Sequence, residues 1–430
     1  MTVSTPETTE GARMSEVTQL AEKARAAARL LALTSTEERN AALRAMADAL
    51  VERQAEIISA NDEDMAAARE EGTQSGLLDR LELNAARIEA IADAIRDVAA
   101  LPDPIGQVVT GHTLPNGIEL RQVRVPLGVV AMIYEARPNV TGDAAALCVK
   151  TGNAVILRGG SLAAKSSMAM TQVLSAACAK AGLPEYSVQT IADVGHESAT
   201  ELMSLTGMID LLIPRGGASL IKSVVQNARV PVIETGVGNC HVYVHEKADA
   251  EMATRIVVNA KCQRPAVCNA AESLLIDDSI HQTVLPQILQ ALEAQGVTVY
   301  GDEKTLGLGA IQSIEPATEE DWHAEYYELK IACKVVAGLD DAIAHVNTYG
   351  TGHSEAIVTE DYSAAQRFLA EVDAAAVYVN ASTRFTDGAE FGLGAEIGIS
   401  TQKLHARGPM GLTALTSAKW QALGSGQIRE

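Results

Sequence analysis

The sequence predicts an α/β protein with two lobes and a cleft between them. From Val129 onward, short continuous apolar runs alternate with longer amphipathic segments. This is the pattern of parallel strands that are covered by helices on both faces. The chain has 430 residues, enough for two or three domains. Its 47% hydrophobic and 21% charged residues are ordinary for a soluble globular protein.

The segment before Val129 predicts helices followed by a β-hairpin. Apolar residues recur at helical spacing in three stretches, namely Glu16 to Leu31, Thr36 to Ala60 and Asn84 to Ala99. Residues 1–13 lack the apolar core of a signal peptide, and we expect a frayed tail there. Asn116-Gly117 lies between alternating apolar residues and predicts a hairpin within residues 106–125. Because a two-stranded ribbon is marginal alone, we expect it to pack on something else, such as a partner subunit.

Two sets of alternating strands and helices follow the hairpin. In the first set we expect the strands Val129 to Tyr134, Ala154 to Leu157, Val188 to Ala192, Ile209 to Ile213 and Val230 to Ile233, and the helices Val140 to Lys150 and Leu162 to Ala181. In the second set we expect the strands Ser273 to Ile276, Val297 to Tyr300, Lys334 to Val336, Ala356 to Val358 and Val377 to Val379, and the helices Asp249 to Cys262 and Ile280 to Ala294.

Charge and composition argue against several classes of function. Lys and Arg number 34 against 55 Asp and Glu, a net charge of −21 that repels nucleic acid and anionic membranes. No apolar run is long enough for a membrane span. The six cysteines contain no CxxC pair and fit neither a disulfide scaffold nor a zinc site. We therefore expect a cytoplasmic protein with reduced thiols, no metal, and a small-molecule substrate.

Cys268 is the most informative residue of the chain. It lies in a loop between a predicted helix and the strand that starts at Ser273, at the rim of an α/β sheet. Lys261 and Arg264 precede it closely, and cations favour the nucleophilic thiolate. The alternative is a small buried hydrophobic residue, which is the commoner role of a free cysteine.

Polar and glycine-rich turns follow several of the predicted strands. In Glu135-Ala-Arg-Pro-Asn139, Asn139 can either cap the next helix or donate its amide to an oxyanion. Leu157-Arg-Gly-Gly-Ser-Leu162 and Ile213-Pro-Arg-Gly-Gly-Ala-Ser219 are turns of the kind that bind phosphate or a dinucleotide, although Ser161 can also be only an N-cap. The long polar stretch from Asn380 to Gly411 supplies cations for an anionic substrate, namely Arg384, Lys403 and Arg407.

Five motifs together closely resemble the γ-glutamyl phosphate reductases, a branch of the aldehyde dehydrogenase superfamily. They are Tyr134-Glu-Ala-Arg-Pro-Asn139, Ile213-Pro-Arg-Gly-Gly217, Gln263-Arg-Pro-Ala-Val-Cys-Asn269, Tyr378-Val-Asn-Ala-Ser-Thr-Arg-Phe-Thr-Asp387 and Thr401-Gln-Lys-Leu-His-Ala-Arg-Gly-Pro-Met-Gly411. The resemblance runs from about residue 15 to the C-terminus, and the long C-terminal motifs are specific to that branch.

The resemblance implies an aldehyde dehydrogenase-like fold with two Rossmann-like α/β lobes and a small β oligomerisation arm. It places the cofactor-binding domain in residues 14–106 and 127–236, the catalytic domain in 237–408, and the arm in 107–126 and 409–430. It also implies reduction of L-glutamate 5-phosphate by NADPH to L-glutamate 5-semialdehyde and phosphate, the second step of proline biosynthesis from glutamate. We expect a dimer or tetramer, and an association with glutamate 5-kinase is a further expectation.

The resemblance also assigns roles to residues. Cys268 matches the nucleophile that forms a thioester, and Asn139 matches the oxyanion-hole asparagine. Arg158 and Ser161 replace the lysine and glutamate of NAD-preferring relatives, which favours NADPH because no carboxylate repels its 2′-phosphate. The expected cofactor-binding residues are Arg158, Gly159, Gly160, Ser161, Arg215, Gly216, Gly217 and Glu325. The expected substrate-binding residues are Arg264, Arg384 and Arg407.

Two alternatives remain open on the sequence. Glu234 aligns with the water-activating glutamate of hydrolytic aldehyde dehydrogenases, so a hydrolytic NAD(P)-dependent enzyme is one alternative. A catalytically silent binding protein on the same fold is the other. Glu325 is followed by Tyr326-Tyr327 where the superfamily has Phe-Gly, which weakens its match to the glutamate that holds the nicotinamide ribose.

Overall fold

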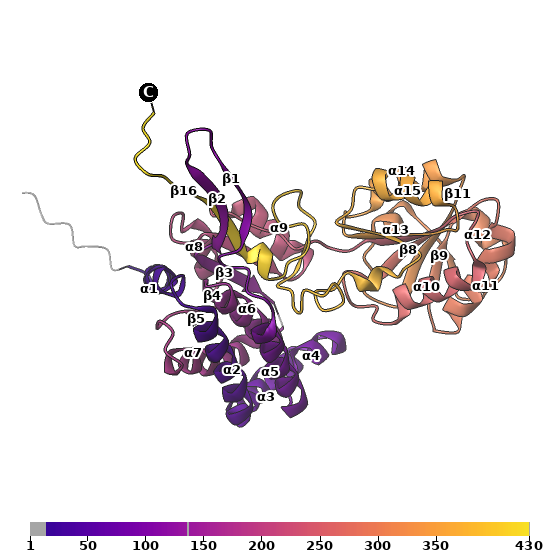
Figure 1. Cartoon of the computed structure of the whole chain (residues 1–430). Coiled ribbons are helices and arrows are strands. Elements are labelled where there is room, and N and C mark those ends of the chain that lie inside the picture. Colours follow the sequence, from indigo (N-terminus) through magenta and orange to yellow (C-terminus); the bar gives the residue numbers. More distant parts are fainter. Residues whose placement is uncertain (1–13, 136, 430) are drawn as a thin grey trace, which may run out of the picture.

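The computed structural model describes residues 14–135 and 137–429, and these residues form the two α/β lobes that the sequence predicts (Figure 1). The first lobe comprises helices α1 to α9 and one parallel sheet, and the second lobe comprises a larger parallel sheet with helices α10 to α15. A three-stranded arm stands on the first lobe (Figure 1). The frayed tail expected for residues 1–13 lies outside the described residues.

A four-stranded parallel sheet, in the order β5-β4-β3-β6, forms the centre of the first lobe. Its strands are β3 (Val129–Tyr134), β4 (Ala154–Gly159), β5 (Val188–Thr190) and β6 (Leu211–Arg215). The expected strand Val230 to Ile233 is wrong, because this segment makes only an isolated bridge between Val232 and Leu212. The chain runs outward from β3 to β5 and then returns to β6 on the other side of β3. The point where the strand order reverses therefore lies between β3 and β6.

Helices cover both faces of this sheet. Alternate residues of β3 point to opposite sides, so Val130 and Met132 join one core and Val129 and Ala131 join the other. The helices are α1 (Glu16–Leu31), α2 (Thr36–Glu52), α3 (Gln54–Glu70), α4 (Ser75–Leu81), α5 (Ala85–Ala100), α6 (Asn139–Lys150), α7 (Ala164–Lys180), α8 (His196–Ser204) and α9 (Ala218–Asn227). The single helix expected from Thr36 to Ala60 is wrong, because Arg53 leaves the helical conformation and separates α2 from α3.

A seven-stranded parallel sheet, in the order β10-β9-β11-β8-β7-β12-β13, forms the second lobe. Its strands are β7 (Cys240–Val244), β8 (Ala271–Asp277), β9 (Thr298–Gly301), β10 (Ile314–Pro316), β11 (Lys330–Val336), β12 (Ser354–Val358) and β13 (Ala376–Val379). Its helices are α10 (Ala250–Cys262), α11 (His281–Glu293), α12 (Glu303–Gly307), α13 (Glu319–His323), α14 (Leu339–Tyr349) and α15 (Tyr362–Glu371). The predicted strands of this set are confirmed, since buried parallel strands are the continuous apolar runs that sequence shows most clearly.

After β13 the chain returns to the first lobe. The returning segment contains η2 (Thr383–Phe385), β14 (Ile399–Ser400), β15 (Gly408–Pro409) and η3 (Leu412–Leu415), and η1 (Ser161–Ala163) precedes α7. Ile397, Ala406 and Met410 belong to the core of the first lobe. The loop from Asn380 to Glu396 therefore connects the second lobe to the first.

The arm is an antiparallel sheet of β1 (Val108–Thr113), β2 (Glu119–Pro126) and β16 (Thr416–Leu423). The predicted hairpin is confirmed, and Gly117 in its turn has a φ of +85°, a left-handed conformation that glycine adopts without strain. The C-terminal strand β16 pairs with β2 along its whole length, so the chain itself supplies a third strand to the ribbon.

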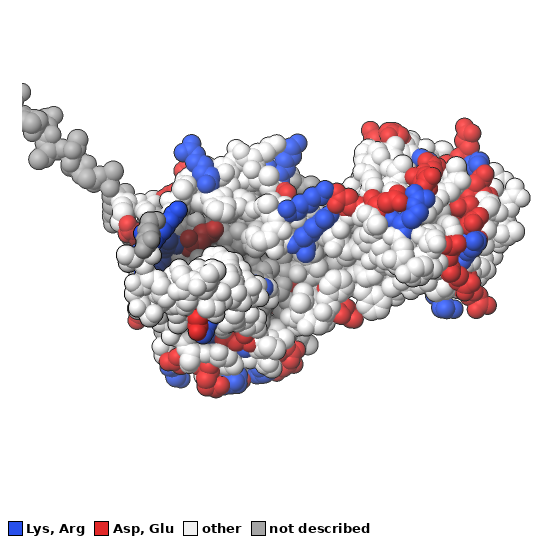
Figure 2. Space-filling view, turned by 45° about the horizontal axis from the view of Figure 1, so that its top comes forward, with Lys and Arg blue, Asp and Glu red and all other residues white. Residues whose placement is uncertain are grey.

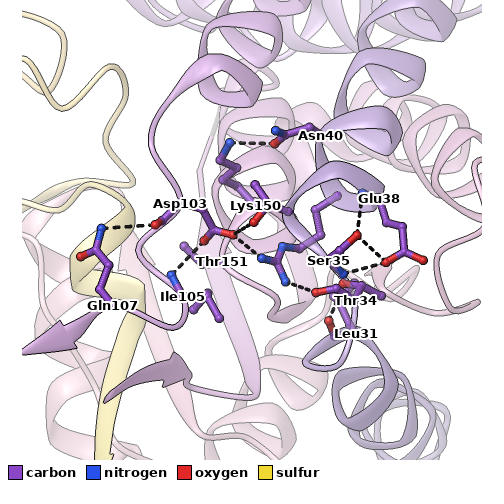
Figure 3. Close-up of polar contacts among 12 residues, drawn as sticks. Leu31, Thr34, Ser35, Glu38, Asn40, Asp103, Ile105, Gln107, Lys150 and Thr151 are labelled. Carbon is purple, nitrogen blue, oxygen red and sulfur yellow. Dashed lines mark hydrogen bonds and ion pairs between the residues drawn. The ribbon is translucent and has the colours of Figure 1, made fainter. Parts of the chain in front are cut away.

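Buried charges fix the base of the arm to the first lobe (Figure 3). Asp103 forms an ion pair with Arg39 of α2, whose side chain is buried, while that of Asp103 is 9% exposed. Asp103 also accepts a hydrogen bond from the Ile105 N–H at 2.9 Å. Lys150 of α6 donates to Asn40 Oδ1 at 2.7 Å and to the Ala99 carbonyl at 2.8 Å. These bonds anchor the segment that leads from α5 into β1.

The carboxyl edge of the first sheet faces the amino edge of the second. Residues that follow β3 and β6 line the same cavity as residues that precede β8. No helix of the described residues is long and apolar enough to cross a membrane.

Candidate functional site

A cavity of about 600 Å³ lies between the two lobes. Six arginines and five carboxylates line it, together with Cys268 and Asn139. Part of its first-lobe wall follows β3 and β6, at the reversal of the strand order where open parallel sheets bind ligands, and most of the rest comes from α4, α5 and the turn between them. In Figure 2, acidic side chains are spread over the outer part of the second lobe, and several basic side chains stand near the junction of the lobes.

Cys268 lies in the loop between α10 and β8, half-buried. The loop is at the sheet rim, as the sequence predicts, but at the amino end of β8, the edge opposite to the one where open parallel sheets bind ligands. The backbone at Gly238 packs directly against the Cys268 loop: a Cβ on Gly238 would lie 1.4 Å from the Cys268 carbonyl oxygen. The same oxygen accepts a bond from Cys240 Sγ at 3.2 Å. Only glycine at position 238 leaves room for this loop.

The charges around Cys268 come from distant parts of the sequence. Burial raises the pKa of the thiol, and the guanidinium groups of Arg215 and Arg137 act against that rise. The expectation that Lys261 supports the thiolate is wrong, because its ammonium group is fully buried in an ion pair with Glu272.

Asn139 lines the cavity beside Cys268 and is the first residue of α6. The capping interpretation is wrong, because Pro138 occupies the N-cap position and no side chain caps this helix. The Asn139 amide donates to Asp143 Oδ2 at 3.3 Å. An amide nitrogen carries two hydrogens, so one donor is left for a group in the cavity.

The three arginines expected to bind substrate do not lie together. Arg264 and Arg384 line the cavity, and Arg384 Nε donates to Gln263 Oε1 at 2.9 Å. Arg407 instead lines a separate cavity beside the arm and pairs with Asp373 at 2.7 Å. The structure therefore brings two of the three into the cavity that contains Cys268.

The first glycine turn is the loop after β4. Arg158 is 8% exposed and donates through Nη2 to the carbonyl oxygens of Val194 and Gly195, the latter at 2.9 Å, while its buried Nε has no partner. Gly160 donates its N–H to the Tyr134 carbonyl at 2.7 Å. Ser161 is exposed and its side chain caps neither η1 nor α7, so the N-cap alternative is wrong.

The second glycine turn, at the end of β6, has residues in the cavity and a residue bonded to the chain outside it. Arg215 and Gly216 line the cavity. The Gly217 N–H at the start of α9 donates to Glu135 Oε2 at 2.8 Å, so a carboxylate of the chain itself occupies this helix end.

Neither Glu325 nor Glu234 is among the residues that line the cavity, but Glu325 acts on Cys268 through its charge. Glu325 accepts the Gly238 N–H at 2.8 Å and the Tyr327 hydroxyl at 2.5 Å, and its negative charge raises the pKa of Cys268. Glu234 is not among the residues that line the cavity, and its backbone N–H donates to Gln402 Oε1 at 3.2 Å.

Several charged residues of this cavity were not assigned from the sequence, and three of them stand close to the Cys268 loop or the thiol. Arg137 is half-buried, and burial together with nearby Arg215 and Arg80 lowers its pKa to about 10. Arg80 of α4 reaches from the first lobe to the Ala266 carbonyl of the Cys268 loop, at 2.9 Å. Glu396, in the loop that returns from the second lobe, has a buried Oε2 without a partner. Arg137 and Glu396 lie within motifs that the sequence singled out, but nothing in those motifs shows which side chains point inward.

The described residues contain no group of three or more His, Cys, Asp or Glu side chains that could hold a metal ion. All six cysteines are free thiols.

Comparisons with known proteins place the chain in a family. The model of the Aldehyde dehydrogenase family matches residues 2–323 and 331–420. A "Gamma-glutamyl phosphate reductase" of Moorella thermoacetica is 57% identical over 415 residues, which are 96% of this chain and 99% of that protein. One of Thermobifida fusca is 55% identical over 414 residues, 96% of this chain and 99% of that protein. The crystal structure of gamma-glutamyl phosphate reductase from Thermotoga maritima has a TM-score of 0.94 and 47% identity, and the match covers 97% of this chain and 100% of that one. The chain thus belongs to the aldehyde dehydrogenase family, and within it to the gamma-glutamyl phosphate reductases.

Proposed function

We propose that this chain reduces L-glutamate 5-phosphate to L-glutamate 5-semialdehyde and phosphate with NADPH, in the biosynthesis of proline. The observation that carries the proposal is a half-buried thiol, Cys268, in a cavity lined by six arginines on a chain of net charge −21. The substrate carries a phosphate and a carboxylate, and arginine is the side chain best suited to both. The names of the relatives point to the same substrate.

The thiolate of Cys268 attacks the acyl carbon of the acyl phosphate and forms a thioester. Arg215 and Arg137 stabilise the thiolate against the cost of its burial. The second hydrogen of the Asn139 amide and the Cys268 N–H donate hydrogen bonds to the oxyanion, and each such donor is worth about 3 kcal/mol in sites of this kind. Asp143 orients the amide through the bond at 3.3 Å.

Arg264 and Arg384 are our assignments for the anionic groups of the substrate. Both line the cavity, and Arg384 lies close enough to Cys268 that a thiolate there raises the pKa of its guanidinium against the stronger lowering by burial. Arg407 is left out of this assignment because its guanidinium is paired with Asp373 elsewhere.

Membership of the family implies a nicotinamide cofactor, which supplies a hydride when bound. The turn after β4 fits such a group: a Cβ on Gly159 would lie 3.1 Å from Ser167 Oγ, and the buried Arg158 Nε and Ser167 Oγ lack partners. We assign Arg158 to the 2′-phosphate of NADPH, with Gly159, Gly160 and Ser161 beside it. Arg215, Gly216 and Gly217 are assigned to the cofactor as well, and Glu325 to its nicotinamide ribose.

Phosphate dependence tests the proposed reaction in its oxidative direction. Purified protein is mixed with glutamate 5-semialdehyde and NADP, with and without inorganic phosphate, and absorbance of the reduced cofactor is followed. We expect reduction of NADP only with phosphate, because phosphate must discharge the thioester. Glu234→Gln should keep this activity, since no activated water is needed. Equal rates without phosphate, together with loss of activity in Glu234→Gln, would establish the hydrolytic alternative.

The arm is the proposed site of oligomerisation, as a dimer or tetramer. All six residues of β1 are exposed, including Val108 and Val109, and β1 is an edge strand without a partner on its outer side among the described residues. We also propose a cytoplasmic location and an association with glutamate 5-kinase, whose acyl phosphate product is labile. Light scattering of the protein alone and with the kinase tests both assemblies.

A further inference from the structure

The proposed acyl transfer needs a group that moves a proton. The thiol of Cys268 must lose its proton before attack, and the departing phosphate must gain one. We propose that Glu396 performs both transfers, taking the proton from the thiol and giving it to the bridging oxygen of the phosphate. This inference rests on the proposed function and adds a catalytic residue to it.

Glu396 is held in the cavity by the fold of its own loop. The loop turns back on itself through the Phe391 N–H to the Asp387 carbonyl, at 2.9 Å, and the Leu393 N–H to the Gly388 carbonyl, at 2.8 Å. A Cβ on Gly388 would lie 2.8 Å from the Glu396 Cβ, so the loop closes this tightly only with glycine. Glu396 lines the same cavity as Cys268, and its buried Oε2 has no hydrogen-bond partner among the residues that the structure describes.

The other carboxylates that line the cavity or act on Cys268 hold hydrogen bonds or ion pairs, and Asp79 and Glu82 pair with Arg87. Each oxygen of Glu325 accepts a hydrogen bond, from Gly238 and from Tyr327. Asp143 also lines the cavity, and burial raises its pKa to about 6. Its Oδ2 accepts the Asn139 amide, and the groups that act against the rise are Asn139 and Arg215, whereas a thiolate on Cys268 acts on the pKa of Glu396. Asp387 Oδ1 accepts the Ala389 N–H at 2.9 Å. Glu234 does not line the cavity.

The charges around Glu396 give it a suitable affinity for a proton. Burial raises the pKa of Glu396 to about 7, against the opposing effect of Arg215. A thiolate on Cys268 and the carboxylate of Asp387 raise it further. His353 also lies within range of this carboxylate, but burial lowers the pKa of His353 to about 4, so the imidazole is neutral near pH 7. A carboxyl that titrates near neutrality can both accept and return a proton there.

The atoms of the step balance. The S–C bond forms between Cys268 and the acyl carbon, and the bond from that carbon to the bridging oxygen breaks. The thiol proton passes to Glu396 and then to the leaving oxygen, so an acyl phosphate dianion and a thiol give a thioester and hydrogen phosphate. Nothing is oxidised or reduced, and Glu396 ends in its initial state.

The pH dependence of thiol alkylation tests the transfer from Cys268 without substrate or cofactor. Wild type and Glu396→Gln are treated with iodoacetamide between pH 5 and 10, and the Cys268 peptide is quantified by mass spectrometry. Cys268→Ser gives the background from the other thiols. A coupled acid and thiol titrate in two macroscopic steps, so the wild-type rate should show a shoulder near neutral pH.

In Glu396→Gln the shoulder should vanish. The alkylation rate should then follow a single ionisation and fall about tenfold per pH unit below its midpoint. The midpoint should also shift to lower pH than the upper wild-type step, because the nearby negative charge is gone. Glu390→Gln, an exposed carboxylate in the same loop, is the matched control and should keep the wild-type profile. Identical single-step profiles in wild type and Glu396→Gln would overturn the proposal.

Release of phosphate separates this inference from the proposed function. Enzyme mixed with L-glutamate 5-phosphate in the absence of cofactor should release one burst of phosphate, about 10² to 10⁴ times more slowly in Glu396→Gln. A normal burst in the variant would overturn the role of Glu396 and leave the function standing. No burst in wild type, with a two-step alkylation profile, would reject the function and leave the proton transfer between Glu396 and Cys268 standing.

Discussion

The buried ion pair between Lys261 and Glu272 should stabilise the second lobe without tuning the nucleophile. Lys261 in α10 and Glu272 in β8 flank the Cys268 loop, and both side chains are fully buried. Lys261 also lies over the Tyr326 ring, 5.9 Å from its centre, and Glu272 Oε1 has no hydrogen-bond partner. Burial raises the pKa of Glu272 to about 7 and lowers that of Lys261, so each charge depends on the other.

Removing one partner should cost far more than removing both. Lys261→Met leaves a buried carboxylate that must remain unpaired or take up a proton, at a cost of about 3 to 5 kcal/mol in the free energy of unfolding. Lys261→Met with Glu272→Met replaces the pair by apolar side chains, and the double variant should lie within about 1 kcal/mol of wild type. The coupling energy of the cycle should therefore be at least about 3 kcal/mol.

Urea unfolding at pH 8 measures the cycle, with a parallel measurement of Cys268 alkylation. The alkylation profile of Lys261→Met should match wild type, because the charge of Lys261 is directed to Glu272. Three results would refute this reasoning. The first is a loss below about 1 kcal/mol in Lys261→Met, and the second is a double variant as unstable as Lys261→Met. The third is a shift of the Cys268 alkylation profile in Lys261→Met.

Three further predictions concern the active site and the core. Asn139→Ala should lower kcat about a hundredfold or more with an unchanged Tm, whereas a lowered Tm with normal kcat would mean a structural role. Arg158→Ala should raise the KM for NADPH far more than that for NADH, and an equal rise for both would exclude a role at the 2′-phosphate. Burial, with His241 and Lys334 nearby, lowers the pKa of His345 from 6.5 to about 3. The unfolded chain therefore binds a proton at this residue more readily than the folded one, so the stability that the neutral imidazole contributes is complete above pH 6.5 and is lost as the pH falls from 6.5 to 3. Lowering the pH from 6.5 to 5 should therefore reduce the free energy of unfolding of wild type by about 2 kcal/mol through His345. In urea unfolding, His345→Gln should lose correspondingly less stability than wild type over the same pH range.

The sequence predicted the sheets well because their strands are buried on both faces. Such strands are continuous apolar runs, and β3 and β8 can be found from that property alone. The hairpin could be predicted equally well, because the Asn116-Gly117 turn needs a glycine at positive φ. The break between α2 and α3 was not, because apolar spacing continues through Arg53 and only its backbone conformation ends the helix.

The site could be predicted only in part because its residues come from both lobes. Proximity in sequence was misleading for Lys261, which points to Glu272 rather than to Cys268. Arg215 and Glu396 are far from Cys268 in sequence, and only the meeting of the two lobes brings them to the thiol. A motif shows that a charged residue is present, but its partner is decided by tertiary packing.

The most direct test of the central claim is to trap the acyl-enzyme. Protein is mixed with L-glutamate 5-phosphate without reduced cofactor, quenched in acid, digested and mapped by mass spectrometry, with Cys268→Ser as the control. We predict a γ-glutamyl adduct on the peptide that contains Cys268, formed together with one equivalent of phosphate and absent from the Cys268→Ser protein. Phosphate release without an adduct on that peptide, or the same adduct in Cys268→Ser, would contradict the account.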